Sequence, residues 1–108
     1  MIFFQDLYLG ESISPKVDQI MKKLNNGKTV PNLFLITLSE NPDNMLEIVS
    51  QWEVMQKGYP STDIKVVGLA NGKKEAFALV HFIVEQALRE TGSANARDYL
   101  KQRWEGQA

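Results

Sequence analysis

Hydrophobic and polar positions follow the same order in two stretches of this chain, residues 33–49 and 64–80. Each stretch begins with an apolar run, continues through a polar turn and ends where a helix begins, and the second follows the first by 31 positions. The apolar positions correspond in pairs: Leu33 with Ile64, Leu35 with Val66, Leu38 with Leu69, and Val49 with Val80. The repeat predicts two strand–helix units, with strands over 32–38 and 63–69. Because one helix joins these strands, we expect them to be parallel, with a right-handed crossover.

N-cap residues, first-turn prolines and glycine stops predict the limits of the helices. The expected helices cover residues 14–26, 42–57, 72–90 and 94–103. Strand formers over residues 2–9 predict a further short strand. The fold class that these elements indicate is α/β: a small parallel sheet of two to three strands, flanked by about four helices.

Helical spacing also predicts which residues pack in the core. In the helix over 42–57 these are Met45, Ile48, Val49, Trp52 and Met55. In the helix over 72–90 they form two flanks: Phe77, Val80, Val84 and Leu88, and Ala76, Leu79, Ile83 and Ala87. Phe82 lies outside this stripe, roughly 140° around the helix from Phe77. Either the final helix folds back over Phe82, or this helix joins the interface of a homodimer, which would also cover exposed sheet edges.

The length of 108 residues favours one α/β domain over residues 1–108, and the 44% of hydrophobic residues is ordinary for a globular protein. The net charge is −1. The absence of cysteine excludes disulfides, thiolate catalysis and sulfur-ligated metals. There is no basic stripe for nucleic acid, and the longest nearly unbroken apolar run, 76–84, is too short to span a bilayer. Since the start also lacks a secretory signal, we expect a cytoplasmic protein without metal or cofactor that binds neither nucleic acid nor membrane.

Ligands of α/β folds bind outside the carboxyl ends of parallel strands. The residues expected at that edge are Glu40, Asn41, Asn71, Gly72, Lys73 and Lys74. The turn over 68–74 combines two glycines, two lysines and the start of a helix, which suits a phosphate-bearing ligand. It lacks both the Gly-x-Gly-x-x-Gly pattern and a P-loop ending, so ordinary turn chemistry is the alternative.

Catalytic candidates are few. His81, the only histidine, precedes Glu85 by one helical turn, and such a pair can orient an imidazole for base catalysis. A partly buried packing histidine is the simpler interpretation. The acids Glu40, Asp43 and Glu47 gather where a helix dipole favours them. We therefore assign no catalytic residue.

Four groups of short strings are similar to those of one protein group. They are Asp6-Leu7-Tyr8 with Glu11-Ser12-Ile13, Asn41-Pro42-Asp43-Asn44 with Leu46-Glu47, Val67-Gly68-Leu69-Ala70 with Gly72 and Glu75-Ala76, and Glu90-Thr91-Gly92 before Tyr99. Together they resemble a group of short bacterial α/β proteins with no assigned activity. The resemblance covers nearly the whole chain and implies a free-standing small cytoplasmic protein. It implies no catalytic residue, cofactor or partner.

These patterns favour a non-enzymatic interaction or binding module that acts as a homo-oligomer, most simply a homodimer. The alternative is a small-molecule or phosphate-ligand site at the strand carboxyl ends, with or without weak transferase or hydrolase chemistry.

Overall fold

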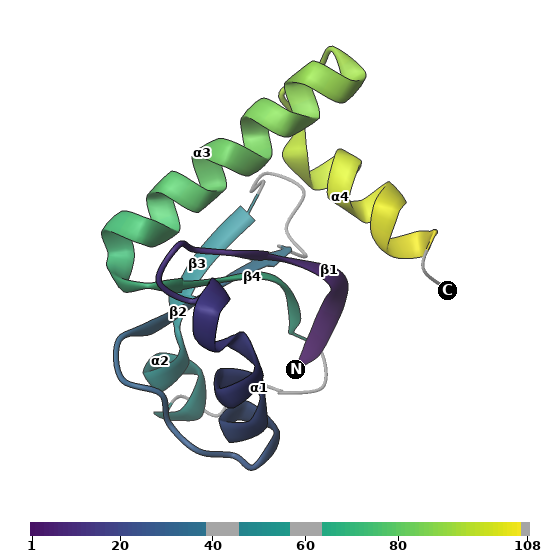
Figure 1. The fold of residues 1–108 in the computed structure, drawn as a ribbon. Helices are drawn as coiled ribbons and strands as arrows, with labels where there is room; N and C mark the ends of the chain where they lie inside the picture. Colours follow the sequence, from purple (N-terminus) through teal and green to yellow (C-terminus); the bar gives the residue numbers. More distant parts are fainter. Residues whose placement is uncertain (39–45, 57–63, 107–108) are drawn as a thin grey trace.

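A mixed four-stranded sheet lies between helices on both of its faces (Figure 1). The computed structural model describes residues 1–38, 46–56 and 64–106. In these ranges the sheet has the spatial order β1-β4-β2-β3, and its strands are β1 (Ile2–Leu9), β2 (Leu33–Leu38), β3 (Leu46–Ser50) and β4 (Lys65–Asn71). The α-helices are α1 (Val17–Asn25), α2 (Gln51–Gln56), α3 (Gly72–Thr91) and α4 (Ala96–Glu105), and a 3₁₀ turn, η1 (Ser14–Lys16), leads into α1. The predicted α/β class is confirmed.

The prediction of parallel strands over 32–38 and 63–69 is wrong, because β2 and β4 are antiparallel. Leu33 lies opposite Asn71, and Thr37 lies opposite Val66. Among the described strands, β1 and β4 are the parallel pair. The sheet is therefore mixed, and it has four strands where two or three were expected.

Residues 46–50 account for the difference, because they form β3 instead of the middle of a helix over 42–57. Their apolar positions fit both helical spacing and strand alternation, so periodicity alone does not distinguish the two. In the structure β3 pairs with β2 along its whole length, which places Ile48 opposite Ile36. Of the predicted helix, the described part retains Gln51–Gln56. Without one long crossover helix between β2 and β4, the requirement for parallel strands disappears.

Each face of the sheet has its own hydrophobic core. The core under α1 and α2 contains Ile13, Ile20, Leu24, Leu33, Leu35, Val54, Val66 and Leu69. The core under α3 and α4 contains Phe4, Ile36, Val67, Ala70, Ala76, Leu79, Ile83, Ala87, Ala96, Tyr99 and Leu100. A bulge in β4 redirects its side chains, since the register shifts between Val66 and Gly68 against β2. Gly68 suits this place because an added Cβ would lie 3.2 Å from the carbonyl oxygen of Tyr8.

Helix α2 buries different residues from those expected. Trp52 and Met55 are 61% and 43% exposed, whereas Gln51 and Val54 are buried. The Gln51 side chain accepts a hydrogen bond from the backbone N–H of Val30 (2.7 Å) and donates one to the carbonyl of Lys28 (2.8 Å). The buried amide therefore fixes the segment that leads into β2.

Helix α3 is buried along one flank only. Its buried residues are Ala76, Leu79, Ile83 and Ala87. On the other flank Phe77 is 64% exposed and Leu88 is 50% exposed, so these two do not belong to the core as predicted. Helix α4 follows α3 through Gly92, which adopts the left-handed conformation, and packs against it (Figure 1). It nevertheless leaves Phe82 47% exposed.

Candidate functional site

A groove of about 660 Å³ lies between the carboxyl end of β1 and the first half of α3. Its apolar lining comes from Tyr8 and Leu9 on one side and from Ala78, Leu79 and Phe82 on the other. The rings of Tyr8 and Phe82 meet edge to face, with centroids 6.2 Å apart. Its polar lining comes from Glu11, Asn71, Lys74 and Glu75. Because β1 and β4 are parallel, the groove lies at the carboxyl ends of a parallel pair, though not the predicted pair.

The carboxylate of Glu75 ties the end of β1 to the start of α3. Its Oε2 accepts a hydrogen bond from the Ser12 hydroxyl (2.6 Å), and its Oε1 accepts one from the backbone N–H of Asn71 (3.1 Å). Burial alone would raise the pKa of Glu75, but these hydrogen bonds and the charge of Lys16 lower it overall. Gly10 makes room for this carboxylate, since a Cβ there would lie 1.9 Å from Oε1. Glu75 is therefore an ionised, hydrogen-bonded wall of the groove.

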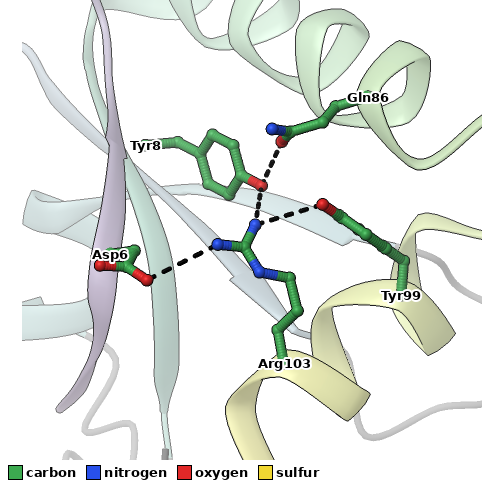
Figure 2. A network of polar contacts seen from close by, with 5 residues as sticks. All are labelled: Asp6, Tyr8, Gln86, Tyr99 and Arg103. Atoms are coloured by element: carbon green, nitrogen blue, oxygen red, sulfur yellow. Dashed lines mark hydrogen bonds and ion pairs between the residues drawn. The ribbon is translucent and has the colours of Figure 1, made fainter. Parts of the chain in front are cut away.

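Tyr8 connects the groove to a polar network that joins three elements (Figure 2). Its hydroxyl donates to Oε1 of Gln86 on α3 (2.5 Å) and accepts from Nη1 of Arg103 on α4 (2.9 Å). The same Nη1 donates to the hydroxyl of Tyr99 (3.3 Å), and Nη2 forms an ion pair with Asp6 (3.6 Å). The side chain of Asp6 is 71% exposed, so this ion pair contributes little to stability. The network holds α4 against β1.

Aromatic rings surround the guanidinium of Arg103. Its Cζ lies 5.5 Å from the ring centroids of both Phe4 and Tyr99, within the range of cation–π attraction. Trp104 stacks on Phe4 with centroids 5.4 Å apart. Burial would lower the pKa of Arg103, but Tyr8 and Tyr99 raise it overall, so the guanidinium stays charged.

The two tyrosines of the network remain neutral at physiological pH. Burial is the largest cause that raises the pKa of Tyr8, and it outweighs the opposing charge of Arg103. Burial also raises the pKa of Tyr99, helped by a hydrogen bond with Glu90. Both hydroxyls therefore act as hydrogen-bond donors and acceptors, and neither is activated as a nucleophile.

Of the six residues predicted to form one crevice, the structure describes four. Asn71, Gly72, Lys73 and Lys74 lie together where β4 ends and α3 begins, whereas Glu40 and Asn41 lie outside the described residues. Because β2 runs antiparallel to β4, the carboxyl end of β2 lies beside the start of β4, at the opposite edge from Asn71. The premise of a shared edge is therefore wrong.

Two backbone N–H groups of the predicted anion-binding turn already donate to acceptors within the protein. The N–H of Gly72 donates to the carbonyl of Asn32 (2.9 Å), and the N–H of Asn71 donates to Glu75. The Asn71 side chain accepts a hydrogen bond from Asn32 (2.7 Å) instead of capping α3. Phosphate binding at this turn stays a prediction, and it would compete with the carboxylate of Glu75.

The two lysines of this turn lie on opposite flanks of α3. Lys74 lines the groove beside β1. Lys73 lines a second hollow, of about 510 Å³, between α3 and β3. The apolar residues of this second hollow are Phe34, Leu46, Ile48 and Phe77, and Glu53 adds a carboxylate. We call it the α3–β3 hollow.

His81 and Glu85 form the expected pair, with 3.0 Å between Nε2 and Oε1. Their side chains are 74% and 57% exposed, so His81 is a surface residue and not the partly buried one expected. Sequence reasoning missed the roles of Tyr8, Arg103 and Glu75. No local spacing reveals them, because Tyr8 and Arg103 lie 95 positions apart and Ser12 and Glu75 lie 63 apart.

Within the described residues, no three His, Asp or Glu side chains converge in a way that could hold a metal ion. In the same part of the chain, every helix is too short or too polar to cross a membrane. No protein-family model, curated protein or solved structure matches this chain.

Proposed function

We propose that this chain is a non-enzymatic interaction module that acts as a homodimer, joined through β3 and the exposed flank of α3. The observation that carries the proposal is an apolar surface that the described residues leave exposed, beside a strand edge that no other described strand pairs with. Among the described strands β3 is the last of the sheet, and Phe77, beside it, is 64% exposed. Such an edge offers backbone hydrogen bonds to another strand, and burial of the apolar surface stabilises the pairing.

The sequence of β3 suits pairing with a copy of itself. A twofold axis through Ile48 would place Ile48 opposite its own copy in an antiparallel pair. In that register Glu47 would lie opposite Val49, so the two Glu47 carboxylates would not face one another. Leu46 and Ile48, on the α3 side of the sheet, would bring the two α3–β3 hollows together.

The charges of the hollow also suit a twofold partner. Each copy supplies one cation, Lys73, and one carboxylate, Glu53, on the rim of an apolar surface. A twofold axis pairs such a rim with itself, so the cation of one copy can meet the carboxylate of the other. Full burial of Phe77 would add about 2 kcal/mol to association.

The ionisable groups that the structure brings together support binding over catalysis. The hydrogen bonds of Arg103 with Tyr8, and of Glu75 with Ser12, join elements of the fold. The raised pKa of Tyr8 leaves its hydroxyl protonated. These are structural roles, which a scaffold for an interface requires.

Sedimentation velocity on two matched variants tests the proposal. Phe77→Glu places a charge on the proposed interface, and Phe82→Glu places the same charge on the opposite flank of α3, where Phe82 was expected to mark the interface. We expect dimers for the wild type and Phe82→Glu, and monomers for Phe77→Glu, at concentrations up to about 500 μM.

A third variant, Ile48→Lys, tests the strand edge itself, and far-UV circular dichroism verifies that each variant is folded. A monomeric wild type at the highest concentration would refute the homodimer. Loss of the dimer in Phe82→Glu, with retention in Phe77→Glu, would refute the β3 surface and assign the interface to the Phe82 flank.

A further inference from the structure

We infer that the groove between β1 and α3 binds a free α-amino acid with an apolar side chain. This site lies on the flank of α3 opposite the proposed dimer surface, so it is independent of self-association. Three features of the groove point to this ligand: its size, its aromatic lining, and the sign and position of its charges.

The groove can hold a small molecule. Its volume of about 660 Å³ lies within the range of ligand pockets. Phe82 is 47% exposed, and among the described rings it meets only Tyr8, in an edge-to-face contact, so much of its surface is available to cover a ligand side chain. Ala78, one turn before Phe82, leaves space that a larger residue would fill. The apolar part of the ligand would lie on these residues.

Charges of both signs line the same groove. Lys74 and Glu11 each lie there exposed, and neither side chain forms an ion pair or a hydrogen bond with another residue of the described ranges. Glu75 adds a second carboxylate, which is held in place by hydrogen bonds from Ser12 and Asn71 and whose oxygens can each accept more than one hydrogen bond. A ligand with one ammonium and one carboxylate matches this set, with the ammonium near Glu11 and Glu75 and the carboxylate near Lys74.

Ligands with one kind of charge match less well. An anion such as phosphate would meet two carboxylates, and the amides of Asn71 and Gly72 already have acceptors. An amine without a carboxylate would leave Lys74 unpaired. The zwitterion satisfies all three charged side chains, and the aromatic lining selects an apolar side chain.

NMR titration of the ¹⁵N-labelled protein with three probes tests this inference. L-Phenylalanine carries both charges, 2-phenylethylamine lacks the carboxylate, and 3-phenylpropionate lacks the ammonium. We expect L-phenylalanine to shift the amides of Gly10 and Ala78, and each analogue to bind about tenfold more weakly, the effect of one lost charge contact. Absence of shifts with L-phenylalanine up to about 20 mM would refute the site, and equal binding of either analogue would refute recognition of the zwitterion.

Matched variants test which side chain of the groove contacts each charged group of the ligand. Lys74→Gln should weaken L-phenylalanine about tenfold and leave 2-phenylethylamine unchanged, and Glu11→Gln should leave 3-phenylpropionate no weaker. Lys73→Gln is the control, because Lys73 belongs to the same turn but lines the other hollow. Equal losses in the two lysine variants would refute the assignment. Phe77→Glu should leave the titration unchanged, which separates this test from that of the homodimer.

Discussion

A single methyl group added at Gly10 should have a measurable effect on stability through Glu75. An added Cβ would lie 1.9 Å from Oε1 and 2.5 Å from Cδ of Glu75, so the carboxylate must move away in Gly10→Ala. The backbone of Gly10 itself is compatible with alanine, because its φ is not in the left-handed region. Its N–H, which donates to the carbonyl of Leu69 (2.9 Å), is retained. The whole cost therefore comes from displacement of Glu75.

The magnitude follows from the bonds that the carboxylate loses. Hydrogen bonds to a charged group contribute roughly 1.5–3 kcal/mol each when buried. We take about 1 kcal/mol for each of the two here, because Glu75 is half-buried and water compensates part of the loss. Alanine recovers about 0.5 kcal/mol by restricting the unfolded chain. Gly10→Ala should lower the free energy of unfolding by about 1.5 kcal/mol, a fall of roughly 6–12 °C in Tm.

A double-mutant cycle isolates this mechanism. In a Glu75→Ala background no carboxylate opposes the methyl group, so Gly10→Ala should become neutral or stabilising by about 0.5 kcal/mol. The expected coupling is about 2 kcal/mol, measured by urea unfolding followed by tryptophan fluorescence. Equal destabilisation by Gly10→Ala in both backgrounds would refute the reasoning, since the effect would then not depend on Glu75.

Three further predictions concern the side chains of Glu75, Gln51 and Arg103. The pKa of Glu75 is lowered in the folded state, so the stability that its ionisation adds is complete above its ordinary value of 4.5 and is lost as the pH falls through the folded-state value. Urea unfolding from pH 7 to pH 3 should show wild type and Glu75→Gln converging at low pH. Gln51→Leu leaves the N–H of Val30 without its acceptor and should cost about 2 kcal/mol in a urea melt. Arg103→Lys keeps the charge but loses the planar contacts with Tyr8 and the rings, so Tm should fall by roughly 4–8 °C, and an unchanged Tm would show that charge alone suffices.

Local signals in the sequence located two of the elements. Strand formers over 2–9 predicted the position of β1, and cap and stop residues predicted a helix close to α3. Residues 46–50 were ambiguous, because Ile48 and Val49 fit a helix and a strand equally. Pairing with β2 decides between them, and a pairing partner cannot be read from local periodicity. The error in strand direction followed from this one segment.

The candidate site was predictable in part. The turn that contains Asn71 and Lys74 was singled out, and it does line the groove. Glu75 was missed because its partners, Gly10 and Ser12, come from a distant part of the chain, and Lys73 and Lys74 were not separable by sequence. The exposed flank of α3 is the one beside β3, the last of the described strands in the sheet. It was not predictable, because it depends on residues 46–50 forming a strand.

The pairing of β1 with β4 sets an order for synthesis on the ribosome. Ile2 lies opposite Lys65, and Phe4 is covered by Arg103 and Trp104 of α4. After it leaves the exit tunnel, β1 must therefore wait for β4 before it has a strand to pair with, and for Arg103 and Trp104 before the ring of Phe4 is shielded. Contacts between residues so distant along the chain slow folding and prolong the exposure of aggregation-prone apolar segments. We expect the nascent polypeptide to depend on chaperones early, and to fold productively only after the codons for α4 have been translated.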